Sequence, residues 1–485
     1  MNAEYELKLD LEVPKDAELL AEALELGAPA VTRLHSVYFD TPDLKLAALG
    51  YTLRIRQEGC KRIQTLKASD GAHAGLFVRP EWEEPARGRV PRLRADSPVV
   101  AALGARTAEL GPCMEVEVTR SVWTIEHERA VIEMAVDCGE VRANDSTAPF
   151  CEIELELKDG DVAGLFALAR RIGRLAQVRL GVLSKAERGQ RLIKPPGDSD
   201  KARPIQLAPD MSAGDAFRAI AHDCLRQYRL NETRLLAGDN GKALHQARVA
   251  LRRLRTAILV FRPIVDGGQT RRLTADLRWL AGRLSPARNI DVLIPRVRSK
   301  AVQARLGGAR ASAYAAARRA MTSDLTRELM IDLVEWLSVG KWMLRKRGRK
   351  LREAPLGDYA PGAIGGFHDR LMAEREAVAG PDDEMRHEAR KTAKKLRYTV
   401  AFFASLYRTG KLRKGRMRYL AALEELQDEL GALNDLAVLP AVLATLGVGA
   451  EQAEGALRDG KERDFHISRA ADTMRMVAEA DRFWE

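Results

Sequence analysis

Ionisable side chains recur at every second residue in the N-terminal part of the chain. The two clearest runs are Glu4, Glu6 and Lys8, and Glu152, Glu154 and Glu156. Residues at i, i+2 and i+4 of a strand point to one face, so each run gathers its charges on one side. One such run alone is typical of a solvent-facing edge strand. Clustered carboxylates also suit a hard divalent cation.

Recurrence of the spacing favours the metal-binding interpretation. It returns at Arg54 and Arg56, at Arg79, Glu81 and Glu83, and at Glu115 and Glu117. The alternate positions are mostly apolar, which predicts a barrel with charges inside and apolar residues outside. Buried like charges repel one another unless an ionic ligand compensates them. Carboxylates for a metal, together with Arg and Lys for phosphate oxygens, indicate a metal-bound triphosphate.

A second constellation combines one histidine with Arg and Lys at helical spacing, and it occurs twice. The two stripes are His245, Arg248, Arg252 and Arg255, and His387, Arg390, Lys394 and Arg397. Offsets of i, i+3, i+7 and i+10 lie along one helical face. Almost no acidic residue lies within either stripe. One such stripe would ordinarily be a solvated basic face, but its repetition favours a polyanion site, and two histidines alone make a poor metal site.

The elements that carry these residues change in kind along the chain. Strand periodicity prevails to about residue 185, for example in His35–Phe39, Leu53–Gln57, Ile63–Lys67, Met114–Thr119 and Val131–Asp137, with helices expected at about 15–26 and 161–175. A run of Pro, Gly and Asp predicts a linker at 196–209. Leu- and Ala-rich helical spacing then dominates to the C-terminus. We therefore predict an α+β protein of two domains, 1–195 and 210–485, the second all-α with an internal duplication.

Charge is distributed unevenly between the two parts. Residues 1–200 carry a net charge of −6 and the remainder +17, within a total of +11. The basic part therefore suits a polyanionic partner such as polyphosphate or nucleic acid. Five scattered cysteines without a C-x-x-C pair predict buried thiols in a reducing compartment, without zinc or disulfides. Because no apolar run is long enough to span a membrane, we expect a cytoplasmic protein with no membrane partner.

Five ordered motifs in residues 1–195 resemble the CYTH superfamily of triphosphate tunnel enzymes. They are Glu4-x-Glu6-x-Lys8, Tyr38-Phe-Asp40-Thr-Pro42, Leu53-Arg54-Ile-Arg56, Glu152-Ile-Glu154 and Ser184-Lys185. The resemblance implies an eight-stranded antiparallel β tunnel that uses Mg²⁺ or Mn²⁺. It implies metal ligands at Glu4, Glu6, Asp137, Glu152 and Glu154, catalytic roles for Glu4, Glu6 and Lys8, and substrate contacts from Lys8, Arg54, Arg56, Lys67, Arg79, Arg120 and Lys185.

The helical part resembles the CHAD domain, an α-helical module marked by paired histidines among Arg and Lys. The resemblance rests on the two repeated stripes and implies a basic surface that binds inorganic polyphosphate. The residues implied are His245, Arg248, Arg252, Arg253, Arg255, His387, Arg390, Lys391, Lys394, Lys395 and Arg397. Nucleic acid is a less favoured partner, because these helices lack the aromatic residues that single-strand binders interleave with cations.

These features together predict a metal-dependent triphosphatase that cleaves inorganic triphosphate to diphosphate and phosphate. No P-loop motif and no zinc-protease H-E-x-x-H pattern offers another route. Three alternatives stay open at this point. The tunnel could act on thiamine triphosphate or a nucleotide, as a hydrolase or an adenylate cyclase; it could bind polyphosphate without turnover; or the basic helices could associate with RNA.

Overall fold

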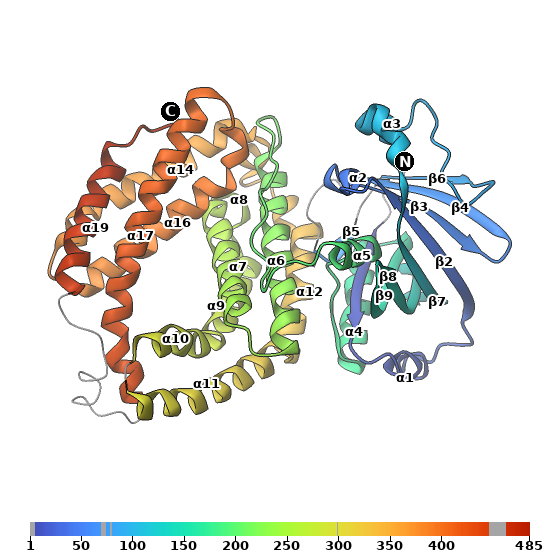
Figure 1. Cartoon of the computed structure of the whole chain (residues 1–485), viewed down its shortest axis with the longest axis horizontal. Helices are drawn as coiled ribbons and strands as arrows, with labels where there is room; N and C mark the ends of the chain where they lie inside the picture. Colours follow the sequence, from blue (N-terminus) through green and yellow to red (C-terminus); the bar gives the residue numbers. More distant parts are fainter. Residues whose placement is uncertain (1–4, 69–73, 78–79, 298, 446–461) are drawn as a thin grey trace. The chain divides into compact units, whose positions relative to one another are not determined.

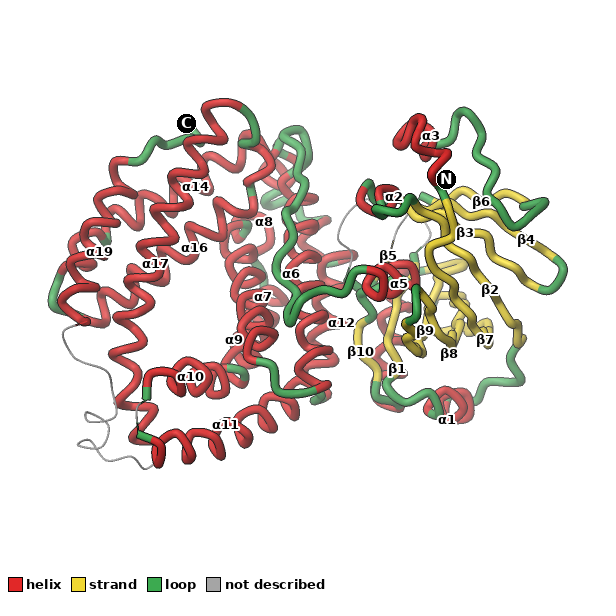
Figure 2. The backbone as a smooth tube through the Cα atoms, viewed as in Figure 1, coloured by secondary structure: helices red, strands yellow, loops and turns green. Residues whose placement is uncertain are grey.

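The computed structural model describes residues 5–68, 74–77, 80–297, 299–445 and 462–485, and it divides the chain into two compact units (Figure 1). Unit 1 comprises Met1–Asp200 and Thr322–Gly340, and unit 2 comprises Lys201–Met321 and Lys341–Glu485. Unit 1 is built on strands and unit 2 on helices (Figure 2). The predicted α+β class is therefore confirmed.

Unit 1 contains an antiparallel sheet. Its strands are β1 (Glu6–Leu11), β2 (Ala30–Asp40), β3 (Tyr51–Glu58), β4 (Lys61–Ala68), β5 (Leu76–Phe77), β6 (Glu81–Pro85), β7 (Gly111–His127), β8 (Ala130–Ala143), β9 (Ser146–Gly160) and β10 (Val178–Leu180). The strand order is β10-β1-β9-β8-β7-β2-β3-β4-β6, and β5 pairs with β1 outside this path.

The segment from β5 to β6 joins the two sides of the sheet. Phe77 of β5 is paired with Glu6 of β1, while Glu81 of β6 is paired with Lys67 of β4. The backbone N–H of Lys8 also donates to the carbonyl of Gly75 at 2.8 Å. Because β5 pairs with β1 and β6 pairs with β4, strands close together in sequence bond to the two sides of the sheet, which curls into a tunnel.

The predicted count of eight strands is wrong. The described residues place nine strands along the path, with β5 as a further short strand. The additional strands have a local cause. One side of the tunnel is divided between β5 and β6, and the three-residue β10 adds to β1 through the pairs Leu9–Leu180 and Leu11–Val178. Strand periodicity cannot count such short pieces, because two or three residues define no alternation.

Apolar side chains of β3 and β4 pack outside the tunnel, as predicted, whereas Val116 and Val118 of β7 line its cavity. On β3 and β4, Leu53, Ile55 and Leu66 are buried in a cluster with residues of α2 (Lys45–Ala48) and α3 (Pro98–Leu103). The remaining helices of unit 1 are α1 (Asp16–Ala23), α4 (Val162–Leu175), α5 (Lys185–Ile193) and α12 (Asp324–Val339). The helix α4 contacts the outside of β7, β8 and β9, so the tunnel is covered where its strands are apolar.

The helix α12 lies far along the chain yet belongs to unit 1. It packs against α4, where the guanidinium of Arg170 contacts Asp332 at 2.6 Å and also pairs with Glu335. The guanidinium of Arg327 donates to the carbonyl oxygen of Gly173. The domain boundaries expected at residues 195 and 210 stay a prediction. Domains that are each continuous in sequence do not anticipate that α12 belongs to unit 1.

Unit 2 is all-α in the residues that the structure describes. Its helices are α6 (Ala213–Ala237), α7 (Gly241–Val260), α8 (Arg262–Val265), α9 (Gly268–Arg283), α10 (Ser285–Leu293), α11 (Lys300–Met321), α13 (Arg349–Glu353), α14 (Leu356–Ala373), α15 (Arg375–Ala379), α16 (Asp383–Phe402), α17 (Gly410–Thr445) and α19 (Glu462–Glu479). The two histidine stripes lie on α7 and α16, which contact each other. Asn240 and Asp382 cap these two helices, in agreement with the predicted duplication.

The prediction for cysteines is wrong in two respects. Cys138 of β8 and Cys151 of β9 are paired in register and form a disulfide, with their Cα atoms 4.2 Å apart. Cys60 is exposed, not buried. Cysteine usage therefore no longer argues for a reducing compartment. Within the described residues, no helix has the length and apolar character needed to cross a membrane.

Candidate functional site

The tunnel encloses a cavity of about 450 Å³ lined mainly by polar and charged side chains. Even-numbered residues of β1, β3, β7 and β9 point inward, because strand side chains alternate. The predicted site residues that line it are Glu6, Lys8, Arg54, Arg56, Lys67, Arg120, Asp137, Glu154 and Lys185. Glu4 and Arg79 lie outside the described residues.

One wall of the cavity is acidic. Asp137 of β8 is paired in register with Glu152 of β9, and Glu154 follows on the same face. Oxygen atoms of these three carboxylates lie within 4.8 Å of one another. The side chains of Asp137 and Glu152 are 0% and 1% exposed, and that of Glu154 is 13% exposed. The pairing of β8 with β9 therefore produces a compact, buried oxygen cluster.

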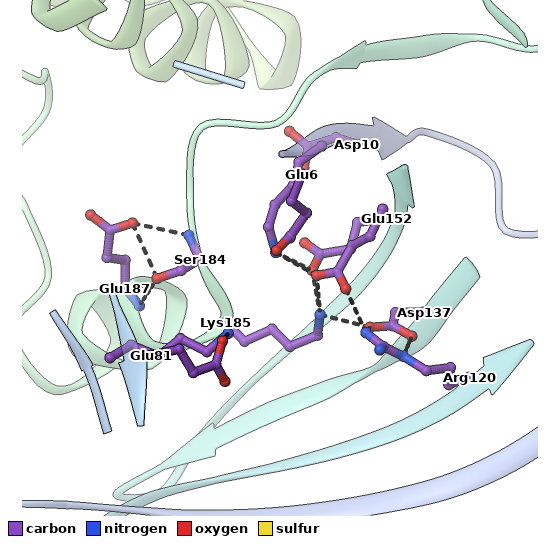
Figure 3. Close-up of polar contacts among 12 residues, drawn as sticks. Glu6, Asp10, Glu81, Arg120, Asp137, Glu152, Ser184, Lys185 and Glu187 are labelled. Carbon is purple, nitrogen blue, oxygen red and sulfur yellow. Dashed lines mark hydrogen bonds and ion pairs between the residues drawn. The ribbon is translucent and has the colours of Figure 1, made fainter. Parts of the chain in front are cut away.

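Two lysines reach this cluster from different elements, and Figure 3 shows one of them, Lys185, pointing toward Asp137 and Glu152. The Nζ atom of Lys185 lies 2.7 Å from Asp137, 2.6 Å from Glu152 and 2.9 Å from Glu154. The Nζ atom of Lys8 lies 3.0 Å from Glu6 and 3.6 Å from Glu152, and it donates to Glu154. Carboxylate oxygens of Asp137, Glu152 and Glu154 thus surround a single cationic group, the Lys185 ammonium.

Charge pairing governs the pKa values on this wall. Burial would raise the pKa of Glu154, but Lys185, Lys8 and Arg120 lower it well below its usual value. Burial would lower the pKa of Lys8 and of Lys185, yet the surrounding carboxylates raise both. Glu154, Lys8 and Lys185 are consequently ionised at neutral pH.

The helix α5 delivers Lys185 into the tunnel. Ser184 begins the helix with a capping box, in which its hydroxyl accepts from the backbone of Glu187 and the Glu187 carboxylate accepts from the backbone of Ser184. Lys185 is the first residue of this helix. At Gly189 a Cβ atom would lie 2.0 Å from the Sδ atom of Met114 on β7, so only glycine lets α5 lie this close to the strands.

The facing wall is basic. Arg54 and Arg56 of β3 and Lys67 of β4 point into the cavity, and Lys67 contacts Glu81 at 2.7 Å. Burial would lower the pKa of Arg54, but Tyr38 on the neighbouring strand raises it above its usual value. The Nε atoms of Arg54 and Arg56 are buried without a hydrogen-bond partner. These cations therefore retain donors for an anion.

The helical unit has its own cavity, of about 1110 Å³, between the two histidine stripes. Predicted residues that line it are His245, Arg248, Arg252, Arg253, His387, Arg390, Lys394 and Arg397. Additional cations from outside the stripes are Lys201, Arg203, Arg288 and Arg296. The Nε atom of Arg252 donates to the hydroxyl of Tyr398 at 2.8 Å, which joins α7 to α16.

Cations in this cavity repel one another. Burial beside Arg390, Arg252 and Arg397 lowers the pKa of Lys394 to about 7. Burial beside Arg288 lowers the pKa of His245 to about 4. This setting is opposite to that of the tunnel lysines and favours an anionic ligand, since a ligand phosphate would relieve the repulsion.

A family model described as the CYTH domain matches residues 2–189, and one described as the CHAD domain matches residues 219–444. The chain contains a CYTH domain followed by a CHAD domain. The resemblance drawn from the motifs is thereby confirmed.

Relatives of known description fall in both domains. The chain is 32% identical over 163 residues to an inorganic triphosphatase from Haemophilus influenzae, and the match spans 32% of this chain and 45% of that relative. It therefore covers less than half of that relative's length.

Among solved structures, the CHAD domain of the plant Ricinus communis is 27% identical, with a TM-score of 0.48, covering 59% of this chain and 98% of that one. A putative adenylyl cyclase from Hippeastrum, described as having a dominant triphosphatase activity, is 23% identical, with a TM-score of 0.31, covering 39% and 95%.

The carboxylates of the CYTH domain fit a divalent metal. Asp137, Glu152 and Glu154 supply only oxygen donors, which Mg²⁺ and Mn²⁺ prefer. The convergence of their oxygens around the Lys185 ammonium shows that one cation can contact all three at once. Glu6 lines the same cavity.

One inward-facing expectation for the CYTH domain is wrong. Glu115 and Glu117 lie on the exposed outer face of β7, whereas Met114, Val116 and Val118, which alternate with them, are buried. Arg142 of β8 pairs with Glu117 at 3.3 Å on that outer face. An alternating pattern fixes which residues share a face, but not which face is inside.

Sequence reasoning named Glu81 and Glu83 only as charges expected inside the barrel, and it did not name Arg188, which contacts the acidic wall. Glu81 and Glu83 face the basic wall, where the Thr65 hydroxyl donates to Glu83 at 3.0 Å. Arg188 of α5 contacts Asp10 at 2.6 Å and Glu152 at 3.2 Å. Spacing of three along α5 from Lys185 is the signal that could have found Arg188.

The structure does not bring every predicted residue of the CHAD domain into its cavity. Arg255, Lys391 and Lys395 are absent from its described lining. Arg253 lines it but is buried against Asp223 at 3.0 Å. Asn434 of α17, which sequence reasoning did not assign, accepts from Arg390 at 3.0 Å and contacts His387 at 2.6 Å.

Proposed function

We propose that the CYTH domain is a metal-dependent triphosphatase that hydrolyses inorganic triphosphate to diphosphate and phosphate, with Mg²⁺ or Mn²⁺. The observation that carries the proposal is the division of charge in the tunnel, where buried carboxylates face Arg54, Arg56 and Lys67. An anion-binding site alone would need no carboxylate cluster, because carboxylates repel phosphate. Metal and cations together are the arrangement that phosphoryl transfer requires.

Each wall has a distinct role in this reaction. Arg54, Arg56 and Lys67 bind phosphate oxygens and hold the chain along the tunnel. Asp137, Glu152 and Glu154, together with Glu6, hold the divalent cation, which when bound neutralises phosphate charge. Lys8, Lys185 and Arg120 balance the charge of the carboxylates and offer donors to the substrate. Positioning and electrostatic stabilisation thus supply the catalysis.

Inorganic triphosphate is favoured over organic triphosphates by the lining of the cavity. Among the described residues that line it, Tyr38 is the one aromatic residue, and the cations Arg54, Arg56, Lys67 and Arg120 are spread along its walls. A nucleobase or thiazolium ring is usually held by stacking on aromatic side chains. Inorganic triphosphate has no ring and therefore needs no aromatic side chain.

Phosphate release tests this proposal. The full chain should release phosphate from inorganic triphosphate faster than from ATP or thiamine triphosphate, and only with Mg²⁺ or Mn²⁺ present. Faster turnover of ATP or thiamine triphosphate would reassign the substrate, and production of cyclic AMP from ATP would indicate a cyclase. No turnover of any of the three, with polyphosphate bound tightly, would leave a binding protein.

We further propose that the CHAD domain binds inorganic polyphosphate in its cavity. Support comes from the cavity lined by His245, Lys394 and Arg390, whose pKa values are lowered by burial and by neighbouring cations, and Asp435 offsets this only in part for Lys394 and Arg390. Fluorescently labelled polyphosphate should bind the full chain and resist competition by RNA of equal phosphate content. Equal competition by RNA would favour a general polyanion site.

A further inference from the structure

The linker that enters the CHAD domain contributes to the wall of the basic cavity. Residues 201–204 line the same cavity as His245, Arg390 and Lys394. We infer that Lys201 and Arg203 are ligands of a polyphosphate chain, so that the linker closes over the chain as a clamp. This inference rests on the proposed polyphosphate binding and names residues that lie outside the two histidine stripes.

Each end of this linker segment is hydrogen-bonded to the unit that it adjoins. Asp200 accepts two hydrogen bonds from Arg191, at 2.8 and 3.0 Å, within unit 1. Within unit 2 the backbone N–H of Leu207 donates to the hydroxyl of Ser405 at 2.9 Å, and that hydroxyl donates to the Leu207 carbonyl at 3.0 Å. The residues between these anchors have no regular secondary structure. A short segment anchored to unit 2 next to the cavity can fold against a ligand with little loss of entropy.

Lys201 and Arg203 have charges available for a ligand. Both side chains are exposed, and neither forms an ion pair with another described residue. The carboxylate that interacts with Arg203 is Asp223, which already pairs with Arg253 at 3.0 Å. Exposed cations at the edge of a buried cationic cavity extend the path that a polyanion can follow.

The sequence makes this clamp easy to probe by proteolysis. Trypsin cleaves after Lys and Arg but not before Pro. Both Lys194 and Arg203 precede proline, so the Lys201–Ala202 bond is the one susceptible bond between Lys194 and Ser212. Exposed irregular segments are the preferred sites of such cleavage. Cutting there yields fragments of 201 and 284 residues.

Limited trypsin digestion of the full chain is the first test. Long-chain polyphosphate should slow cleavage after Lys201 at least about tenfold, whereas triphosphate at equal phosphate concentration should not. Cleavage after Arg94, whose side chain is 74% exposed in the tunnel unit, should keep its rate and serves as the internal control. Unchanged cleavage after Lys201 while polyphosphate is bound would overturn the clamp.

Affinity of variants is the second test. The Lys201→Gln/Arg203→Gln variant should bind long-chain polyphosphate about tenfold more weakly, with a shallower salt dependence. The matched control is Arg262→Gln/Arg271→Gln, which removes two exposed charges of the same unit outside the cavity. Equal losses in both variants would show a general charge effect and sink the inference. Failure of the unmodified chain to bind polyphosphate would instead refute the proposed function.

Discussion

Lysines in the two domains lie in opposite electrostatic settings. In the tunnel, Lys185 lies within 2.9 Å of three carboxylates, which raise its pKa. In the helical cavity, Lys394 is buried beside Arg390 and Arg252, which lower its pKa to about 7. The first lysine belongs to a balanced ionic cluster, and the second to a site short of negative charge. The contrast indicates a cation site in one domain and an anion site in the other.

Polyphosphate binding should depend on pH through Lys394. Its ammonium is protonated below about pH 7 and neutral above, and phosphate binds the protonated form more strongly, so affinity should fall about three- to tenfold as pH rises from 6 to 8. The Asp435 carboxylate raises this pKa in part, and Arg397 lowers it further. Titration of labelled long-chain polyphosphate at each pH measures the effect. Lys394→Arg should remove most of the response, and an equal response in that variant would contradict the assignment.

Residue spacing predicted the carboxylates of the acidic wall. It did not predict, for every strand, which face points into the tunnel. Glu152 and Glu154 share a face with Asp137 because alternation along a strand is fixed by backbone geometry. Alternation did not show that Glu115 and Glu117 point outward. Both the charged and the apolar face of β7 carry residues that could lie either inside or outside the tunnel. Burial of Val116 beside the tunnel cations is a tertiary effect, which a single strand does not encode.

The hairpin of β8 and β9 shows how register could have been read further. Ala143 and Ser146 are paired, so the turn contains only Asn144 and Asp145, and Asn144 has a positive φ of 52°. Turns of Asn and Asp at this length define register. Counting back from it pairs Cys138 with Cys151, so the disulfide was predictable from the turn, whereas the absence of C-x-x-C said nothing about it.

The Asp40 carboxylate should stabilise the tunnel through α2. It accepts hydrogen bonds from the backbone N–H groups of Leu46 at 2.8 Å and Ala47 at 2.9 Å, and Leu46 packs behind Leu53 on the strand that carries Arg54. Asp40→Ala should cost about 1 to 3 kcal/mol in the free energy of unfolding, because buried donors lose their acceptor. Urea unfolding measures this. An exposed control, Asp96→Ala, should leave the free energy of unfolding nearly unchanged.

Close packing of α5 should be necessary for activity. A side chain at Gly189 would displace Met114 or the helix, and with it Lys185. We expect Gly189→Leu to reduce triphosphate turnover about tenfold or more, because small displacements of positioning groups are costly. Phosphate release and circular dichroism of the same preparation separate misplacement from unfolding. Full activity in a folded variant would show that α5 does not position Lys185.

At the scale of the whole molecule, the two units do not follow the order of the chain. The helix α12 comes from the C-terminal half yet packs on α4 through Arg170, Asp332 and Arg327. The change from strand to helical periodicity predicted where the fold class changes. That change in periodicity did not predict that α12 packs on unit 1. Amphipathic periodicity shows that a helix has a buried face, but not which element covers that face.

A chain that ends at residue 200 should therefore be less stable than the tunnel unit of the full chain. It loses α12, whose residues Leu333 and Trp336 are buried, and exposes the α4 surface that this helix covers. Loss of such apolar contacts lowers stability by several kcal/mol, so thermal unfolding should shift by about 5 °C or more. Calorimetry of both chains measures the shift. An unchanged midpoint for the tunnel unit would show that α12 is dispensable.

The most direct test of the account is phosphate release by Glu154→Gln beside Glu117→Gln. Both changes remove one carboxylate of a strand, but Glu154 belongs to the buried cluster and Glu117 to the exposed face. With Mg²⁺ or Mn²⁺ and inorganic triphosphate, kcat/KM should fall about 100-fold in Glu154→Gln and stay within about twofold in Glu117→Gln. Turnover that depends on metal in the unmodified chain and survives in Glu154→Gln would contradict a metal-dependent reaction at this cluster.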